Sequence, residues 1–418
     1  MNVTLTAVPV RGTVRVPSSK SQLHRLLIAA ALGAQPVTIT HNGLSDDIRA
    51  TAACLCALGA ELTMDAQSIS VCPITRVPTG ECILCCGESG STLRFLLPLC
   101  GALGVQAVFL MEGRLPQRPL APLDAELTAH GMTLTREGAR LHVSGQLHGG
   151  AFTLAGNVSS QYITGLLLSL PLLQSASTLH ITGALESAPY IEMTEDVLRL
   201  SGVAAPKTAD GWHIPSCQRY ALPPHCSAEG DWSSAAALLC MGALSPTGVR
   251  VTGLSAASQQ GDRAVARILS DFGAHVAQEP DAITVRRGAL RGLTIDAAQI
   301  PDLVPVLAAL AAAADGTTII TNAARLRLKE SDRLSTTAAT LRALGADVLE
   351  QPEGLIIHGA PTLAGGTVEA CGDHRIAMAA AVAACVCRAP VTITGAQCVQ
   401  KSYPRFWEDL AQLKGACP

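Results

Sequence analysis

Six glycines recur along the chain at intervals of about 71 residues, each directly after an amphipathic stretch that favours a helix. They are Gly59, Gly131, Gly202, Gly273, Gly345 and Gly415, and the stretches before them are residues 48–58, 123–130, 191–201, 264–272, 334–344 and 406–414. Glycine in this place is typical of the left-handed residue that ends a helix. A fixed period indicates a fold assembled from repeated supersecondary units. Features shared by all six copies belong to the scaffold, so we expect chemistry where one copy departs from the others.

A second series of six helix-like stretches alternates with the first. Its members are residues 20–32, 91–103, 160–173, 232–244, 302–314 and 374–387. They are apolar nearly all round, which predicts helices buried on every side. Each repeat is therefore predicted to contain a strand, a buried helix, a strand, a surface helix and a hairpin, such as the one at residues 61–64 and 68–71. Such mixed units favour an α/β fold with helices packed against sheets.

The length of 418 residues exceeds what one hydrophobic core usually supports, which predicts two domains of three repeats each. The segment Pro223-Pro224-His225, between the third and fourth repeats, is the best candidate for the boundary. Only 3% of the residues are aromatic, so the cores must be built from Ala, Leu, Val and Ile.

Composition also excludes several classes of partner. A net charge of −3 argues against nucleic acid or a membrane surface, which would favour a basic face. Residues 2–16 lack the apolar stretch of a secretory signal, and no apolar run is long enough to span a bilayer. The motif Cys82-x-x-Cys85-Cys86 has no second pair at zinc-finger spacing, which argues against a metal site. We therefore expect a reduced, cytoplasmic protein.

Five cations stand where the helix dipole disfavours them. Lys20, Arg94 and Arg375 lie in the first turns of predicted buried helices, and Lys329 and Arg333 flank the start of a surface helix. Each such placement costs roughly 0.3–1 kcal/mol, so five of them call for a common reason. An anionic ligand supplies one, because helix N-termini bind anions and added cations complete the site. No Walker-type or dinucleotide glycine motif is present, which favours a small phosphorylated acid as the ligand.

Several motifs resemble those of the EPSP synthase family of enolpyruvyl transferases over nearly the full length. They are Val16-Pro-Ser-Ser-Lys-Ser21, Ser159-Ser-Gln-Tyr162, Glu229-Gly-Asp231, Lys329-Glu-Ser-Asp-Arg333, Gly372-Asp-His-Arg-Ile-Ala-Met378 and Lys401-Ser-Tyr-Pro404. The resemblance implies two domains of three βαβαββ units, with the active site in the cleft between them. It places residues 14–226 in the first domain. It places residues 1–13 and 227–418 in the second, which the N-terminal strand completes.

The resemblance implies that the enolpyruvyl group of phosphoenolpyruvate is transferred to the 5-hydroxyl of shikimate 3-phosphate, with release of phosphate. This is a step of the shikimate pathway to chorismate and the aromatic amino acids, and the family is the target of glyphosate. No metal or organic cofactor takes part, and we expect a monomer. The residues implied to contact shikimate 3-phosphate are Lys20, Ser21, Arg25, Ser159, Ser160, Gln161, Ser187, Tyr190, Asp302 and Lys329. Those implied to hold phosphoenolpyruvate are Lys20, Gly90, Arg94, Arg118, Gln161, Arg333, Arg375 and Lys401.

The chemistry requires acid–base groups, because the enol carbon gains a proton while a hydroxyl attacks the neighbouring carbon. The resemblance implies Asp302 as the base for the 5-hydroxyl and Glu330, with Lys20, for proton transfer at the enol carbon. Two positions depart from the family pattern: Glu88, where the family often has Asn, and Arg325, where it also often has Asn. A carboxylate at Glu88 would repel a phosphate unless it is turned away.

Two other functions remain open from the sequence. UDP-N-acetylglucosamine enolpyruvyl transferases share the fold and the donor, but they typically carry a cysteine acid in a loop that corresponds to residues 111–120, and this chain has none there. A non-catalytic anion-binding protein is the alternative from a different class. The complete set of Lys, Arg, Asp and Glu residues argues against a decayed site, and phosphate release with both substrates discriminates between the possibilities.

Overall fold

The computed structural model describes residues 1–415, which form two compact units. Unit 1 contains Met1–Ser18 and the chain from Glu229 on, and unit 2 contains Ser19–Ala228. The chain therefore passes between the units twice, at residues 18/19 and 228/229, whereas the sequence predicted these points at 13/14 and 226/227. Strand pairing accounts for the shift. Strand β2 (Gly12–Arg15) pairs along its whole length inside unit 1, and β13 (His225–Ser227) pairs inside unit 2.

Both predicted series of helices are present, with ends that agree to within a few residues except where a 3-10 turn begins or ends a helix. The α-helices of unit 2 are α1 (Lys20–Ala31), α2 (Asp46–Ala57), α3 (Gly90–Leu103), α4 (Leu123–Ala129), α5 (Ser160–Ser169) and α6 (Ala188–Leu200). Those of unit 1 are α7 (Trp232–Leu244), α8 (Val265–Asp271), α9 (Val304–Ala311), α10 (Arg333–Ala343), α11 (His374–Ala383) and α12 (Phe406–Leu413). The 3-10 helices are η1 (Leu115–Gln117), η2 (Leu170–Leu172), η3 (Gly261–Ala264), η4 (Pro301–Leu303), η5 (Ala324–Leu328), η6 (Ala384–Val386) and η7 (Ala396–Lys401).

The fifth buried helix differs most from its prediction. It begins with the 3-10 turn η4 and becomes α-helical only at Val304. Pro305 has no N–H, so the α-helical hydrogen bond from residue 305 to Pro301 cannot form. Asp302 consequently lies in this 3-10 turn, ahead of the helix.

The recurring glycines have the backbone conformation that their position predicts. Gly59, Gly131, Gly202, Gly273, Gly345 and Gly415 all adopt positive φ, between 70° and 105°. A residue with a Cβ is strained in this region, which explains why glycine recurs there. The period of about 71 residues therefore marks the end of the surface helix in each repeat.

Each repeat contributes one small sheet. In unit 2 the sheets run β6-β7-β9-β8, β13-β3-β5-β4 and β10-β11-β12; in unit 1 they run β15-β16-β14-β2, β17-β18-β20-β19 and β1-β22-β21. The strands of unit 2 are β3 (Val37–Thr40), β4 (Glu61–Met64), β5 (Ser68–Cys72), β6 (Cys82–Gly87), β7 (Ala107–Met111), β8 (Met132–Glu137), β9 (Arg140–Gly145), β10 (Ala151–Ala155), β11 (Ser177–Thr182), β12 (Gly211–Ile214) and β13. Those of unit 1 are β1 (Asn2–Leu5), β2, β14 (Val249–Thr252), β15 (His275–Gln278), β16 (Ala282–Arg286), β17 (Thr294–Asp296), β18 (Thr317–Thr321), β19 (Asp347–Gln351), β20 (Gly354–His358), β21 (Gly366–Glu369) and β22 (Val391–Thr394).

The second repeat shows the βαβαββ order most plainly. Strand β6 is parallel to β7, and the hairpin β8–β9 adds to β7 antiparallel. Two sheets have three strands: in the third repeat the last pairing is reduced to an isolated bridge between Lys207 and Trp212, and in the sixth the N-terminal β1 takes the outer place. Two strands are exchanged along the chain, because β13 completes the first repeat and β2 the fourth.

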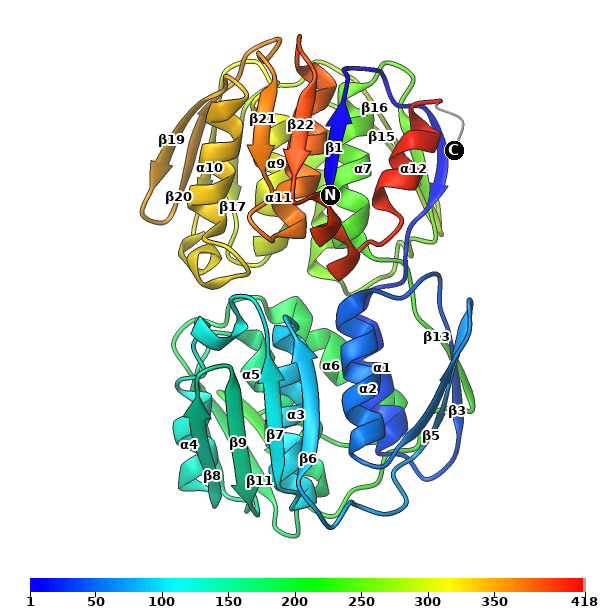
Figure 1. The fold of residues 1–418 in the computed structure, drawn as a ribbon, viewed down its shortest axis with the longest axis vertical. Helices are drawn as coiled ribbons and strands as arrows, with labels where there is room; N and C mark the ends of the chain where they lie inside the picture. Colours follow the sequence, from blue (N-terminus) through cyan, green and yellow to red (C-terminus); the bar gives the residue numbers. More distant parts are fainter. Residues whose placement is uncertain (416–418) are drawn as a thin grey trace. The chain divides into compact units, whose positions relative to one another are not determined.

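Each unit has its own hydrophobic core around its inner helices. All thirteen residues of α7 are buried, and α9 is buried throughout, as predicted from their apolar character. In unit 2, α1 and α2 lie between the sheet of β6 and β7 and the sheet of β3 and β5 (Figure 1). Across residues 1–415, no helix combines the length and apolar character needed to cross a membrane.

Candidate active site

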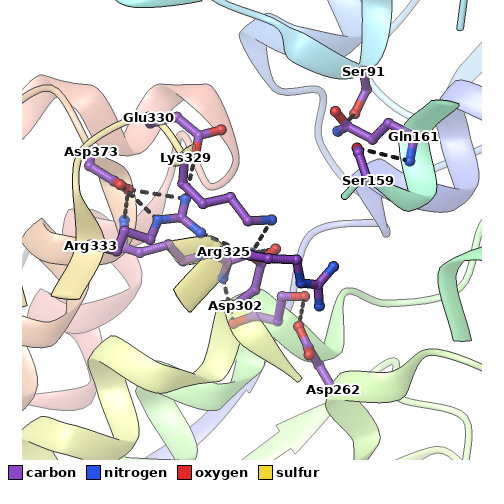
Figure 2. A network of polar contacts seen from close by, with 12 residues as sticks. Ser91, Ser159, Gln161, Asp262, Asp302, Arg325, Lys329, Glu330, Arg333 and Asp373 are labelled. Atoms are coloured by element: carbon purple, nitrogen blue, oxygen red, sulfur yellow. Dashed lines mark hydrogen bonds and ion pairs between the residues drawn. The ribbon is translucent and has the colours of Figure 1, made fainter. Parts of the chain in front are cut away.

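Arg333 is the centre of a charged network in unit 1. It opens α10 and is only 1% exposed. Its Nε donates to Asp373 Oδ2 at 2.7 Å, its Nη1 to Asp302 Oδ1 at 2.8 Å and its Nη2 to Glu330 Oε2 at 2.7 Å (Figure 2). A buried guanidinium needs this compensation, because removing a charge from water is costly unless it is paired. The structure thus joins the predicted cation to both predicted catalytic carboxylates.

Asp302 accepts contacts from three cations. Arg333 Nη1 lies 2.8 Å and Lys329 Nζ 3.5 Å from its Oδ1, and Arg375 Nη2 lies 3.6 Å from its Oδ2. Burial alone would raise the pKa of Asp302, but these three charges together hold it well below its ordinary value. Asp302 is therefore ionised at neutral pH and is a weak base in this arrangement.

Lys329 lies beside the same carboxylate, and the charge of Arg325 acts on Lys329. Burial lowers the pKa of Lys329, and the positive charges of Arg333 and Arg325 lower it further, whereas Asp302 opposes them. Arg325, at one of the positions that depart from the family pattern, donates from Nη2 to the carbonyl of Ala298 at 2.8 Å. Arg325 therefore adds a positive charge to those that can attract an anion in this network.

The remaining predicted cations of unit 1 open or end short helices. Arg375 follows His374 in the first turn of α11, where the N-cap Asp373 accepts the Arg375 backbone N–H at 3.0 Å. Its Nη1 donates to the carbonyl of Ser233 at 2.8 Å. Lys401 is buried at the end of η7. Asp302, Lys329, Glu330, Arg333 and Arg375 are thus brought together within one unit.

In unit 2 the structure places two predicted basic residues on α1. Lys20 is the first residue of the helix, and its Nζ donates to Asp47 Oδ2 at 2.8 Å. Asp47 was not among the predicted site residues. It stands in the first turn of α2, where an acidic residue is ordinary, and nothing in its sequence position distinguished it.

Arg25 is 2% exposed and contacts only neutral acceptors. Its Nε donates to Thr194 Oγ1 at 2.8 Å, and its Nη2 donates to the carbonyl of Tyr190 at 2.6 Å and to Thr164 Oγ1 at 3.2 Å. Its Nη1 donates to the carbonyl of Ser21. Burial lowers the pKa of Arg25 to about 9. A buried arginine whose partners within residues 1–415 include no carboxylate favours an anionic ligand, because a buried charge is stabilised by an opposite one.

Two further guanidinium groups lie against Gly90 at the start of α3. A Cβ on Gly90 would be 2.7 Å from Arg118 Nη1 and 3.1 Å from Arg94 Nη1. Arg94 Nη1 donates to Gln161 Oε1 at 2.7 Å. Gln161 Nε2 in turn donates to Ser91 Oγ at 2.9 Å (Figure 2). The N-terminus of α3 and these cations together favour an anion.

The predicted serines of unit 2 have two different local roles. Ser159 is an ordinary N-cap of α5, since its Oγ accepts the backbone N–H of Gln161 at 3.3 Å, and Ser160 follows it. Ser187 precedes α6 with φ of 54°, and its hydroxyl makes no capping hydrogen bond. A positive φ at a residue with a Cβ is unusual and is often found at functional positions. Tyr190, one turn later, contributes its carbonyl to Arg25.

Glu88, the other departure from the family pattern, directs its carboxylate at a neighbouring loop. The carboxyl group of Glu88 packs against Gly113, whose Cβ, if present, would lie 2.5 Å from Glu88 Cδ. The carboxylate is thus directed at the loop after β7.

Within the part of the chain that the structure describes, no three His, Cys, Asp or Glu side chains are arranged to hold a metal ion.

Comparison with known proteins gives one family. The model described as EPSP synthase (3-phosphoshikimate 1-carboxyvinyltransferase) matches residues 5–410. A 3-phosphoshikimate 1-carboxyvinyltransferase from Clostridium kluyveri is 41% identical over 415 residues, covering 99% of this chain and 97% of that protein. A protein of the same name from Clostridium acetobutylicum is 40% identical over 412 residues, covering 97% and 96%.

Among solved structures, the EPSP synthase from Acinetobacter baumannii has a TM-score of 0.81 to this chain at 24% identity, covering 99% of this chain and 97% of that one. This similarity confirms the predicted α/β fold of the enolpyruvyl transferases. The family match over residues 5–410 and the 41% identity over nearly the whole length extend beyond the fold. The chain belongs to the EPSP synthase family.

Proposed function

We propose that this chain transfers the enolpyruvyl group of phosphoenolpyruvate to the 5-hydroxyl of shikimate 3-phosphate and releases phosphate. The family and the names of its relatives support the reaction. The observation that carries the proposal at the site is Arg25, a buried cation whose partners among the described residues include no carboxylate. Both substrates bear a phosphate and a carboxylate, so they bring the negative charge that such a residue requires.

The proposal distributes the two substrates over both units. Shikimate 3-phosphate would contact Lys20, Ser21, Arg25, Ser159, Ser160, Gln161, Ser187, Tyr190, Asp302 and Lys329. Phosphoenolpyruvate would contact Lys20, Gly90, Arg94, Arg118, Gln161, Arg333, Arg375 and Lys401. Guanidinium groups suit these ligands because they bind carboxylate and phosphate oxygens through two parallel hydrogen bonds.

In the proposed mechanism, the C5 oxygen of shikimate 3-phosphate attacks C2 of phosphoenolpyruvate while C3 gains a proton and becomes a methyl group. Asp302 takes the hydroxyl proton, and Glu330 with Lys20 delivers the proton to C3. Loss of phosphate from the tetrahedral intermediate then returns a proton from the methyl group to the group that delivered it and forms the enol ether of the product. Arg333 and Arg375 would stabilise the negative charge on the phosphate and carboxylate groups.

Because Asp302 is paired with cations, substrate binding would change its strength as a base. Lys329, Arg333 and Arg375 together depress the pKa of Asp302. When substrate oxygens bind to these guanidinium groups, they offset part of the positive charge that Asp302 experiences. Its pKa then rises toward its ordinary value and Asp302 becomes a stronger base when its substrate is present.

A phosphate-release assay tests the proposed function. Phosphate should appear only when phosphoenolpyruvate and shikimate 3-phosphate are both present, and not with UDP-N-acetylglucosamine as acceptor. Arg25→Gln should raise the KM for shikimate 3-phosphate by more than tenfold, because a charge-assisted contact is worth about 1.5–3 kcal/mol. Arg199→Gln, an exposed arginine in the same unit, is the matched control. Absence of phosphate release with both substrates would refute the proposal.

We also propose that the enzyme acts as a monomer in the cytoplasm. Every proposed substrate contact comes from this one chain, which supports the monomer. All cysteines in the described residues are free, which is typical of reducing compartments. Sedimentation of the active enzyme would test the first of these proposals, and fractionation of cells would test the second.

A further inference from the structure

Asp262 is a buried acid that none of the preceding assignments uses. It lies in η3, ahead of α8, and is 1% exposed. Its Oδ2 contacts the hydroxyl of Ser233. Its Oδ1 is buried and has no hydrogen-bond partner within residues 1–415, and none of the cations there lies within ion-pair distance of it.

The neighbouring acids of unit 1 differ from Asp262 in their partners. Asp302, Glu330 and Asp373 each contact Arg333, and Asp231 accepts the backbone N–H groups of Ser233 and Ser234 as the N-cap of α7. Among the described residues, Asp262 has one hydroxyl partner and no counter-ion. A buried carboxyl group in that environment is more stable with a proton than as an anion.

Ser233 connects Asp262 to the network of Arg333. Its hydroxyl contacts Asp262, and its carbonyl accepts Nη1 of Arg375 at 2.8 Å. Figure 2 shows Asp262 beside the Asp302 part of this network. The orientation of Arg375 therefore depends on a serine that is held at its side chain by Asp262 and at its N–H by Asp231.

We propose that Asp262 is a positioning residue that carries a proton and, through Ser233, holds Arg375 in place for a bound anion. The identity of that anion as phosphoenolpyruvate rests on the proposed function. In its protonated form Asp262 orients Ser233 without adding a negative charge beside the anion. Once ionised, it attracts Arg375 itself and repels the ligand, so anion binding weakens.

The charges around Asp262 place this change near neutral pH. Burial raises the pKa of Asp262 to about 7, and the Asp302 carboxylate contributes to the rise. Arg375 and the Ser233 hydroxyl oppose it, and Asp231 adds to it. These groups come from η4, from α11 and from the start of α7.

The first experiment measures stability and needs no substrate. A carboxyl with a raised pKa in the folded protein stabilises it at low pH, and this stabilisation is lost as pH rises toward the folded pKa. The Tm of Asp262→Asn should therefore increase relative to that of the native protein between pH 5 and pH 7, and the difference should stay constant above about pH 7.5. Asp271→Asn, an exposed acid on α8, is the control and should show no such trend. Parallel curves for Asp262→Asn and the native protein would overturn the proposal.

The second experiment measures the KM for phosphoenolpyruvate between pH 6 and pH 8.5. The ratio of the native KM to the KM of Asp262→Asn should rise at least fivefold over this range, because only the native protein gains a negative charge at residue 262. Taking the ratio removes the effect of the ligand's own ionisation, which is common to both proteins. Asp262→Ala should raise KM at least tenfold more than Asp262→Asn, because only the amide retains a partner for Ser233. A constant ratio, or equal losses in both variants, would overturn the proposal.

Ser233→Ala provides a test that does not alter Asp262. The Ser233 hydroxyl favours the ionised form of Asp262, so its removal should raise the pKa of Asp262. The inflection in the plot of KM against pH should then move to higher pH. An unmoved inflection would contradict the proposal. If the native protein released no phosphate with either acceptor, the proposed function would fail. The stability difference would still decide whether Asp262 carries a proton.

Discussion

Asp302 and Arg333 hydrogen-bond to each other at 2.8 Å, although the proposal gives one to proton transfer and the other to anion binding. Substitution of Asp302 therefore has two opposite consequences. Asp302→Asn removes the base, which should lower kcat by about 10²–10⁴-fold. It also frees Arg333 and Arg375 from a competing carboxylate, so the KM for phosphoenolpyruvate should stay level or fall.

Steady-state kinetics with varied phosphoenolpyruvate separates these effects. Asp296→Asn, on the nearby exposed strand end, serves as the control because its carboxylate accepts only a backbone N–H among its contacts within the described residues. A large rise in KM with kcat retained would instead assign Asp302 to substrate recognition.

Gly90 lies against two guanidinium groups, which makes it sensitive to one added methyl group. In Gly90→Ala the Cβ would lie 2.7 Å from Arg118 Nη1 and 3.1 Å from Arg94 Nη1, so both groups, which the proposal assigns to phosphoenolpyruvate, must shift. Glyphosate is longer than phosphoenolpyruvate and should compete with it in the native enzyme. The substitution should weaken glyphosate at least tenfold more than phosphoenolpyruvate.

Inhibition by glyphosate at several phosphoenolpyruvate concentrations tests this, with Gly80→Ala as control, since a Cβ at Gly80 meets no atom within 4 Å. Equal losses for both ligands would show that the methyl group does not discriminate by length.

At the scale of residues, the sequence indicated which cations take part in charged contacts better than it indicated their partners. The cations Lys20, Arg333 and Arg375 could be identified because they oppose the helix dipole. Their partners Asp47 and Asp373 could not, because an acid at a helix start obeys the ordinary rule and carries no signal. Pairing across 27 or more residues depends on packing, which no local pattern contains.

At the scale of elements, α3 and α5 approach each other closely at one point. A Cβ on Gly165 of α5 would lie 2.3 Å from the carbonyl oxygen of Arg94 and 3.0 Å from Pro98 Cγ. Pro98 has no N–H, so it leaves the Arg94 carbonyl without the usual helical hydrogen bond. The small glycine therefore lets α5 pack on a gap in the hydrogen bonding of α3.

Gly165→Ala should separate these helices. We expect a loss of about 1–3 kcal/mol in the free energy of unfolding, typical of overpacking. The KM for phosphoenolpyruvate should also rise, because Arg94 and its partner Gln161 lie on the two helices that move apart. Urea unfolding of Gly165→Ala beside Gly80→Ala measures the difference, and equal stabilities would contradict the packing argument.

The elements themselves were largely predictable. Helix α7 has the predicted bounds, and the hairpin of β4 and β5 lies where the sequence placed it. The sequence could not show that η4 precedes α9, because one proline inside an apolar run does not fix where its first turn forms. Nor could the repeat alone reveal that β13 joins the sheet of the first repeat and β2 the sheet of the fourth. This exchange depends on pairing between segments that are distant in the sequence.

At the scale of the whole molecule, the two units contain separate hydrophobic cores. Without ligands, calorimetry should resolve two unfolding transitions, or one that is broader than a two-state transition. Substrates that contact residues of both units should couple these transitions into one. At about 100 times Kd, each ligand adds about 2.7 kcal/mol of apparent stability. Phosphoenolpyruvate and shikimate 3-phosphate, added separately and then together, provide the comparison. Two unchanged transitions with both ligands present would contradict the assignment of substrate residues to both units.

The three carboxylates on Arg333 have a consequence for which ions the enzyme tolerates. A small monovalent ion such as chloride would have to replace a partner that already makes a charged hydrogen bond, and it offers nothing stronger in exchange. A ligand with several negative oxygens can contact more than one cation at once and so gains more than it displaces. In the proposed site, Arg333 would thus set a threshold of ligand charge that keeps common monovalent anions from occupying it.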